Sequence, residues 1–212
     1  MARQLRKPAG SSGMEVAEKM NAANEFLYDF TLDEMMIREN QSILEIGFGN
    51  GKFFPKQFSR ADNLRITGLD FSRSMVKAAR KQNKELIREG GLSLVKGQSD
   101  KMPFPSASFD KVFCINVAYF WDDPQEHLLE IYRVLRPGGR LYTTIRSREN
   151  MKLLPFTRYG FKTYTEEEWK LLCHLNNLLF IRCSSVHEPD FTGMGAPTGN
   201  RSFCMVAEKR DL

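Results

Sequence analysis

The stretch "SILEIGFGNGKFF", residues 42–54, decides the fold class that we expect for this chain. A short apolar run, residues 43–46, is followed at once by Gly47, Gly49 and Gly51. Because glycine has no Cβ, it admits positive φ and lets another group approach the backbone at contact distance. A buried strand that ends in such a turn is typical of α/β sheets, whose ligands bind beyond the carboxyl ends of the strands.

Strands and helices alternate after this turn. Apolar runs predict further strands, and the segments between them have the periodicity of helices. Strand, helix and strand in repetition indicate right-handed parallel crossovers, and therefore an α/β fold with a doubly wound, mostly parallel sheet. The predicted strands that follow the first one are residues 65–69, 92–95, 111–117 and 140–145.

The end of the chain departs from this alternation. Two predicted strands, residues 178–187 and 202–210, are joined by a loop alone. Strands joined in this way are most simply antiparallel neighbours, so we expect an antiparallel terminal strand.

Helix-start signals mark the remaining elements. A Ser, Thr or Asp cap, with or without an acidic residue three positions later, satisfies free amide groups at the start of a helix. Two signals precede the first strand, so we expect two N-terminal helices, the first with an amphipathic stripe from Val16 to Phe30. The signals are Ser12 with Glu15, Thr31 with Glu34, Ser72 before a helix over 72–89, Asp123 before Pro124, and Thr165 with Glu168.

Length and composition indicate one soluble globular domain. The chain has 212 residues, of which 42% are hydrophobic and 27% are charged, which is the composition of an ordinary globular protein. No apolar run approaches the roughly 20 residues that cross a bilayer. The basic N-terminus lacks an apolar signal segment, so we expect a flexible basic tail at residues 1–13, a single domain at residues 14–212 and a cytoplasmic location.

The net charge of +5 is only a weak indication of nucleic-acid binding. Arg3, Arg6 and Lys7 lie in the tail and leave a charge of +2 for all other residues. So small an excess disfavours a phosphate-binding face, and we expect the tail to be solvated. The four cysteines and three histidines show no zinc-site spacing, so we expect reduced thiols and no metal.

The glycine turn and Asp70 together predict a nucleoside site. Asp70 closes the second strand, beside the first, and a carboxylate can accept both hydroxyls of a ribose. The alternative is a tight turn and a helix cap without a ligand. A dinucleotide fingerprint would need a glycine at position 52, where the chain has Lys52, and Glu45 precedes the glycines. An acid at that place favours a cofactor with an ammonium group and no pyrophosphate.

Four ordered blocks resemble the class I S-adenosylmethionine-dependent methyltransferases, in particular the small single-domain group similar to quinone-biosynthesis methyltransferases. The resemblance covers about residues 40–146, half of the chain. It implies a Rossmann-like methyltransferase fold with seven strands in the order 3-2-1-4-5-7-6, the last strand antiparallel, and S-adenosyl-L-methionine as the cofactor. The blocks are "LEIGFGNG", "ITGLDFSRSMVKAAR", "KGQSDKMPFPSASFDKVFCINV" and "IYRVLRPGGRLYTTI".

The resemblance also implies roles for individual residues. The turn from Gly47 to Gly51 would pass along the methionine part of the cofactor, with Glu45 and the Gly47 carbonyl favouring its ammonium group. Asp70 would accept the ribose hydroxyls, and Phe71 would cover one face of the adenine. The other cofactor contacts would be Gln98, where the family usually has an acid, Ser99 at the adenine edge and Asn116 beside the sulfonium.

We expect the methyl acceptor to be a small organic molecule. A sulfonium methyl is already activated, so in-line placement matters more than acid or base chemistry. Tyr28 and Tyr119 are candidates to orient the acceptor. The leading helix and residues 151–164 and 188–200 surround the shared core and carry apolar groups that suit such a molecule.

Two other functions stay open at this point. The basic tail permits methyl transfer to RNA or protein, but residues 116–119, "NVAY", lack the two prolines of the adenine-amine methylases. A NAD-type oxidoreductase is disfavoured by Lys52, which takes the place of the third glycine.

Overall fold

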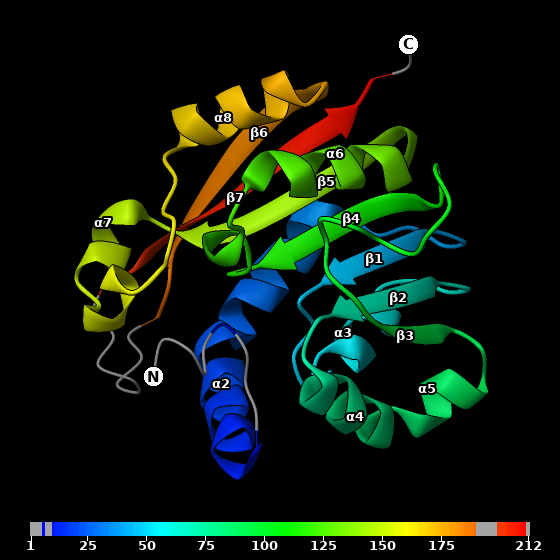
Figure 1. Ribbon diagram of the computed structural model, residues 1–212. Helices are drawn as coiled ribbons and strands as arrows, with labels where there is room; N and C mark the ends of the chain where they lie inside the picture. Colours follow the sequence, from blue (N-terminus) through cyan, green and yellow to red (C-terminus); the bar gives the residue numbers. More distant parts are fainter. Residues whose placement is uncertain (1–5, 7–9, 190–198, 211–212) are drawn as a thin grey trace.

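One sheet of seven strands runs through the molecule (Figure 1). The computed structural model describes residue 6 and residues 10–189 and 199–210. The strand order is β3-β2-β1-β4-β5-β7-β6, which confirms the topology implied by the resemblance. Neighbours among β1 to β5 are parallel, whereas β7 is antiparallel to both β5 and β6. The strands are β1 (Ser42–Ile46), β2 (Arg65–Asp70), β3 (Leu92–Lys96), β4 (Phe109–Ile115), β5 (Leu135–Arg146), β6 (Leu178–His187) and β7 (Arg201–Lys209).

Helices cover both faces of the sheet (Figure 1). Residues of α6 and α8 pack on one face, and residues of α2, α3, α4 and α5 pack on the other. The helices are α2 (Gly10–Met35), α3 (Phe54–Phe58), α4 (Arg73–Gln82), α5 (Lys84–Arg88), α6 (Pro124–Val134), α7 (Arg148–Lys152) and α8 (Glu166–Leu175), with short 3₁₀ helices η1 (Ala118–Phe120) and η2 (Pro155–Arg158).

The alternation of side chains along each strand builds two apolar cores. Leu44 and Val112 pack with α6 and α8, while their neighbours Ile43 and Phe113 pack with α2 and α4. All four side chains are fully buried. Because both faces are covered, the central strands have nearly continuous apolar sequences.

Three of the predicted helix starts are confirmed. Ser72 caps α4 and accepts an amide hydrogen bond with its hydroxyl. Asp123 caps α6, where its carboxylate accepts the amide hydrogen of Gln125. Thr165 begins α8 and forms a complete capping box with Glu168. Each of these signals depends on residues within one turn of the helix, so the local sequence determines them.

The prediction of two N-terminal helices is wrong, because α2 is one continuous helix. Thr31, expected to cap a second helix, lies inside α2 and donates its hydroxyl hydrogen to the carbonyl of Leu27, 2.6 Å away. The same hydroxyl lies 2.7 Å from the hydroxyl of Thr144 on β5. α2 begins at Gly10, so it includes the last residues of the predicted tail, and Ser12 does not precede it.

Two other boundaries differ from the prediction. The helix expected over 72–89 is divided at Asn83 into α4 and α5. The side-chain amide of Asn83 donates to the carbonyls of Ala79 and Gly51, both 3.0 Å away, and so competes with the helix backbone. β5 begins at Leu135, before the glycines expected to precede it, and its pairing with β4 is irregular there.

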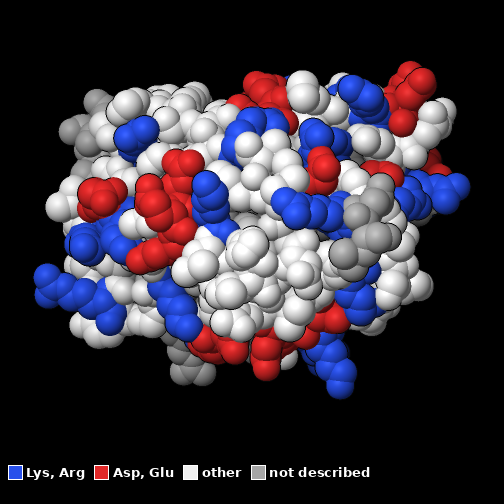
Figure 2. Space-filling model, turned by 90° about the horizontal axis from the view of Figure 1, so that it is seen from above, with Lys and Arg blue, Asp and Glu red and all other residues white. Residues whose placement is uncertain are grey.

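Charges of both signs are mixed on the side of the molecule that lies at the top of Figure 1. Figure 2 shows Lys and Arg side chains interspersed with Asp and Glu around an uncharged area. The described residues of this face therefore form no continuous row of positive charge, as a phosphate backbone would require. Among the described helices, none is both long enough and apolar enough to cross a membrane.

Replacement of Gly51 by alanine is expected to destabilise the protein by about 1–3 kcal/mol more than the same change at Gly90. Both glycines have positive φ, +76° and +80°, so the backbone strain is matched. A Cβ on Gly51 would lie 2.7 Å from the Cβ of Ala79, whereas a Cβ on Gly90 would meet nothing within 4 Å. Urea denaturation of Gly51→Ala and Gly90→Ala measures the difference, and equal losses would contradict it.

Candidate functional site

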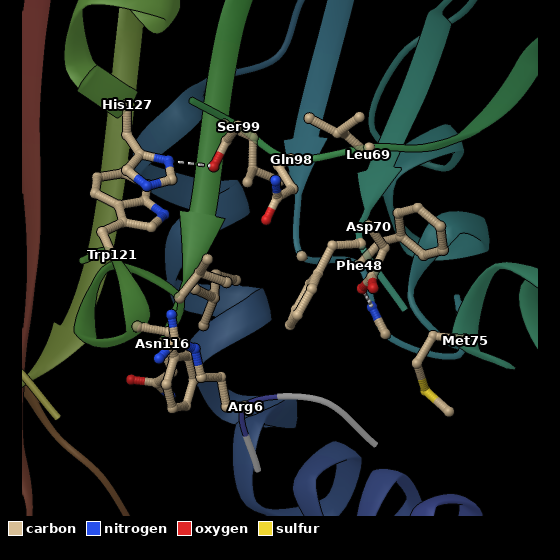
Figure 3. A pocket seen from close by; sticks show the side chains of 18 of the residues that line it. Arg6, Phe48, Leu69, Asp70, Met75, Gln98, Ser99, Asn116, Trp121 and His127 are labelled. Carbon is tan, nitrogen blue, oxygen red and sulfur yellow. Dashed lines mark hydrogen bonds between the residues drawn. The ribbon is translucent and has the colours of Figure 1, made fainter. Parts of the chain in front are cut away.

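A pocket opens at the carboxyl ends of β1, β2 and β4 (Figure 3). The strand order reverses between β1 and β4, which is where ligands of open α/β sheets bind. The part of α2 from Ala17 to Tyr28 forms another wall. The strand ends contribute Ile46, Leu69 and Ile115, and the segment after β3 contributes Gly97 and Gln98. The pocket therefore lies where the sequence predicted it.

The three glycines after β1 all have positive φ, but for different reasons. A Cβ on Gly47 would lie 2.4 Å from a methyl group of Val117, and a Cβ on Gly51 would collide with Ala79 of α4. A Cβ on Gly49 would meet no described atom within 4 Å, so protein packing leaves that space open. Gly47 and Gly49 line the pocket, whereas Gly51 is not among the described lining residues and serves the packing of α4.

Asp70 lies in the pocket wall and holds the glycine turn. Its Oδ2 accepts the N–H of Gly49 at 3.0 Å, and its Oδ1 accepts the N–H of Ser72 at 2.8 Å (Figure 3). Burial raises the pKa of Asp70 from 3.8 to about 6, and the two amide hydrogen bonds act in the opposite direction. The Ser72 contact is the turn considered as the alternative to a ligand site, so Asp70 combines both features. Phe71 lines the pocket next to it.

Glu45, predicted to contact an ammonium group, is absent from the described lining of the pocket. Its Oε1 accepts the hydroxyl hydrogen of Tyr28, and its Oε2 accepts from Nε2 of Gln57 at 2.5 Å. Burial raises the pKa of Glu45 to about 7, although these two hydrogen bonds lower it. Tyr28 lines the pocket and stacks on Phe53, with ring centroids 3.9 Å apart. Glu45 therefore acts on the pocket through Tyr28.

The segment after β3 meets the start of α6 at the pocket. Oγ of Ser99 lies 2.7 Å from Nδ1 of His127, whose ring stacks on Trp121 with centroids 4.7 Å apart (Figure 3). All three residues and Gln98 line the pocket. Burial lowers the pKa of His127, which favours the neutral imidazole. Of these four lining residues, sequence reasoning named Gln98 and Ser99 but not Trp121, in the segment after β4, or His127, on α6.

Asn116 ends β4 on the side of the pocket opposite Asp70 (Figure 3). Its φ of +56° lies in the left-handed region, which Asn tolerates better than most residues. Its Nδ2 donates to Oδ1 of Asn24 on α2 at 3.0 Å, and its Oδ1 accepts from the hydroxyl of Tyr119 at 3.1 Å. Tyr119 is buried and is not among the described lining residues, so it contacts the pocket wall through Asn116.

α2 lines the pocket, as expected of the leading helix, but sequence reasoning named only Tyr28 among its lining residues. The spacings of three and four positions along this set correspond to one face of a helix. The stripe was visible in the sequence, but periodicity alone indicates a buried face and does not distinguish a core from a pocket wall. The residues are Ala17, Met20, Asn21, Asn24 and Tyr28.

The surroundings of the pocket mouth differ from the expectation. Arg6, which was expected to be solvated, lines the pocket, and its Nη2 lies 2.5 Å from Oδ2 of Asp122. Of the segments expected to bind the acceptor, residues 151–164 contribute none of the described lining. Most of the other segment, residues 190–198, lies outside the described part of the chain. Phe48, in the glycine turn, lines the pocket instead.

Comparisons with known proteins agree with this geometry. Residues 44–143 match the family described as "Methyltransferase domain". The uncharacterized methyltransferase YdaC of Bacillus subtilis is 32% identical over 130 residues, which are 61% of this chain and 70% of YdaC. The ubiquinone/menaquinone biosynthesis C-methyltransferase UbiE of Enterobacter sp. is 33% identical over 117 residues, which are 53% of this chain and 45% of UbiE. The chain therefore spans less than half the length of UbiE.

A solved structure is similar over nearly the whole chain. It is one chain of the complex between the Haloferax volcanii Trm112 methyltransferase activator and a methyltransferase, with a TM-score of 0.80. At 21% identity, the match covers 93% of this chain and 95% of the other, and it shows the fold. The sequence, the sheet order and these relatives place the chain in the class I S-adenosylmethionine-dependent methyltransferases, and it is an enzyme of that class.

The stability advantage of the wild type over Glu45→Gln is expected to shrink as the pH rises from about 4.5 to about 7. In this range the folded protein keeps a proton on Glu45, whose pKa is about 7, while the unfolded chain, with the ordinary value of 4.5, loses it. The folded state thus binds more protons, and stability falls with rising pH. Gln57 can accommodate the new amide because its Oε1 has no described partner.

Urea denaturation at a series of pH values measures this effect. Asp70, whose pKa is raised from 3.8 to about 6, also makes the free energy of unfolding fall with rising pH. Because Asp70 is present in both proteins, its contribution cancels in the difference between them. Glu18→Gln, on the exposed part of α2, is the matched control and should follow the wild type. Parallel curves for the wild type and Glu45→Gln would contradict the prediction.

Proposed function

We propose that this protein transfers a methyl group from S-adenosyl-L-methionine to a small organic acceptor in the pocket described above. The observation that carries the cofactor assignment is the carboxylate of Asp70. It is 6% exposed, lines the pocket and is anchored by two backbone amides. Each of its oxygens has a further lone pair, so the group suits the two hydroxyls of a ribose.

The other lining residues suit the remaining parts of the cofactor. Gly47 and Gly49 would lie along the methionine part, and Phe71 would cover a face of the adenine. Gln98 and Ser99 would face the adenine edge from the segment after β3. All five residues line the same pocket, which supports this assignment. Asn116, on the far side from Asp70, would lie beside the sulfonium.

Two residues take indirect roles in this proposal. Glu45 has both oxygens bonded to Tyr28 and Gln57, so it would position Tyr28 instead of contacting the cofactor. Gly51 would keep the turn close to α4.

S-adenosyl-L-methionine supplies an activated methyl group, which passes to the nucleophilic atom of the acceptor while the sulfur keeps the bonding electrons. The chain's part is to align the acceptor in line with that methyl group and to exclude water. Phe120, Trp121 and Met20 give the pocket an apolar wall for an organic acceptor. The UbiE relative, a C-methyltransferase of quinone biosynthesis by name, supports a small acceptor.

Labelled methyl groups from S-adenosyl-L-methionine are expected to appear in small molecules when the protein is incubated with a cell extract. The fractions to compare are small metabolites, RNA and protein, each counted after separation. The matched control is Asp70→Asn, which should lower transfer into the labelled fraction. Label found in RNA or protein alone would contradict the small-acceptor proposal and favour the macromolecular alternative.

Asp70→Asn is expected to lower the affinity for S-adenosylhomocysteine by about tenfold or more. A hydrogen bond to a charged group contributes about 1.5–3 kcal/mol and a neutral one about 0.5–1.5 kcal/mol, so the loss of charge costs about one power of ten. Isothermal titration calorimetry measures the affinity. Asp62→Asn, an exposed carboxylate outside the pocket, should bind as the wild type does. Unchanged affinity in Asp70→Asn, or binding of NAD in place of the sulfur nucleoside, would contradict the assignment.

A further inference from the structure

Four asparagine side chains line the pocket. Asn21 and Asn24 come from α2, Asn50 from the glycine turn and Asn116 from the end of β4. Asn50 and Asn116 are 6% and 9% exposed. Amides from three separate elements thus border the same space, and none of them carries a charge.

The four amides are joined in two hydrogen-bonded pairs. Nδ2 of Asn21 donates to Oδ1 of Asn50 at 3.0 Å, and Nδ2 of Asn116 donates to Oδ1 of Asn24 at 3.0 Å. Each pair uses one donor and one acceptor, although an amide has two hydrogens and a carbonyl oxygen with two lone pairs. Within the described part of the chain, Oδ1 of Asn21 and Nδ2 of Asn24 and Asn50 make no hydrogen bond.

Arg146, at the end of β5, supports the Asn24–Asn116 pair through contacts to both partners. The amide N–H of Arg146 donates to the hydroxyl of Tyr119 at 2.5 Å, and that hydroxyl lies 3.1 Å from Oδ1 of Asn116. The guanidinium of Arg146 donates to the carbonyl of Ala23, the residue before Asn24, at 2.8 Å. Both partners of the Asn24 contact are therefore attached to the same end of β5.

A zwitterion is the ligand that such a set suits best. The amide oxygens can accept from an ammonium group, and the amide N–H groups can donate to a carboxylate. Glu45, which precedes the turn on β1, has both oxygens bonded to Tyr28 and Gln57, so the amide oxygens are the acceptors left for an ammonium group. Asn116 lies on the side of the pocket opposite the Asp70 carboxylate (Figure 3), and Asn24 contacts it at 3.0 Å.

We propose that Asn21 and Asn24 of α2, together with Asn50 and Asn116, bind the amino-acid end of S-adenosyl-L-methionine. This inference rests on the proposed function, and it assigns to α2 a direct part in cofactor selection. The nucleoside end is held by the sheet and the amino-acid end by α2, so the two ends depend on different residues.

Two ligands distinguish binding of the nucleoside end from binding of the amino-acid end. S-adenosylhomocysteine has the ammonium and carboxylate groups, whereas 5′-methylthioadenosine has the same nucleoside and thioether without them. Both ligands are titrated into Asn24→Ala and Asn21→Ala by calorimetry. The affinity for S-adenosylhomocysteine is expected to fall tenfold or more, whereas the affinity for 5′-methylthioadenosine should stay within about twofold of the wild-type value. Asn21→Ala leaves the Asn24 contact with Asn116 in place, so it provides a second variant should Asn24→Ala fold poorly.

The matched control is Glu18→Ala, an exposed position on the same helix, which should bind both ligands as the wild type does. Equal weakening of the two ligands would mean that α2 only closes the pocket, and would overturn the inference. Unaltered S-adenosylhomocysteine affinity in both variants would overturn it as well. Failure of both ligands to bind the wild type would overturn the proposed function, and this inference with it.

Discussion

The carboxylate of Asp70 is the contact on which the pocket depends. It accepts amide hydrogens from Gly49 and Ser72, so it joins the turn after β1 to the start of α4. The N–H of Gly47 also donates to the carbonyl of Leu69 at 2.8 Å, which continues the pairing of β1 with β2 into the turn. Burial disfavours the charged carboxylate and the two amide hydrogen bonds favour it. With a pKa of about 6, the group is ionised at neutral pH.

α2 completes the site, and apolar burial holds it in place more than its ion pairs do. Glu25 pairs with Lys52 and Asp29 with Lys56, along the side that faces α3. These partners are largely solvated, and exposed pairs contribute about 0–1 kcal/mol each. A fully buried leucine such as Leu27 contributes about 1.5–3 kcal/mol, and α2 buries several apolar side chains on the sheet. The stripe of α2 that lines the pocket is thus placed by the core beneath it.

The sequence predicted those features that depend on neighbouring residues. The caps at Ser72 and Thr165 and the glycine turn follow from local geometry, and the strand order followed from the resemblance. Thr31 was misread because its hydroxyl is satisfied inside the helix and by a threonine of β5, far along the chain. The Asn24 contact with Asn116 joins residues 92 positions apart, so no local pattern shows it. Most of the missed site residues come from α2 and α6, which pack onto the strand ends.

The attachment of α2 also determines the order in which the structure can form. This helix is synthesised early, yet Ala23 is held by Arg146, 123 residues later, and Glu34 by Arg182, 148 residues later. Closing such long loops costs entropy before the contacts compensate for it. During synthesis the apolar face of α2 can therefore meet β1 and β4 early, but it completes its packing only when β5 and β7 have been made. The described lining of the pocket ends at His127, yet its α2 wall is attached to Arg146, so ligand binding reports on a stage of folding that includes β5.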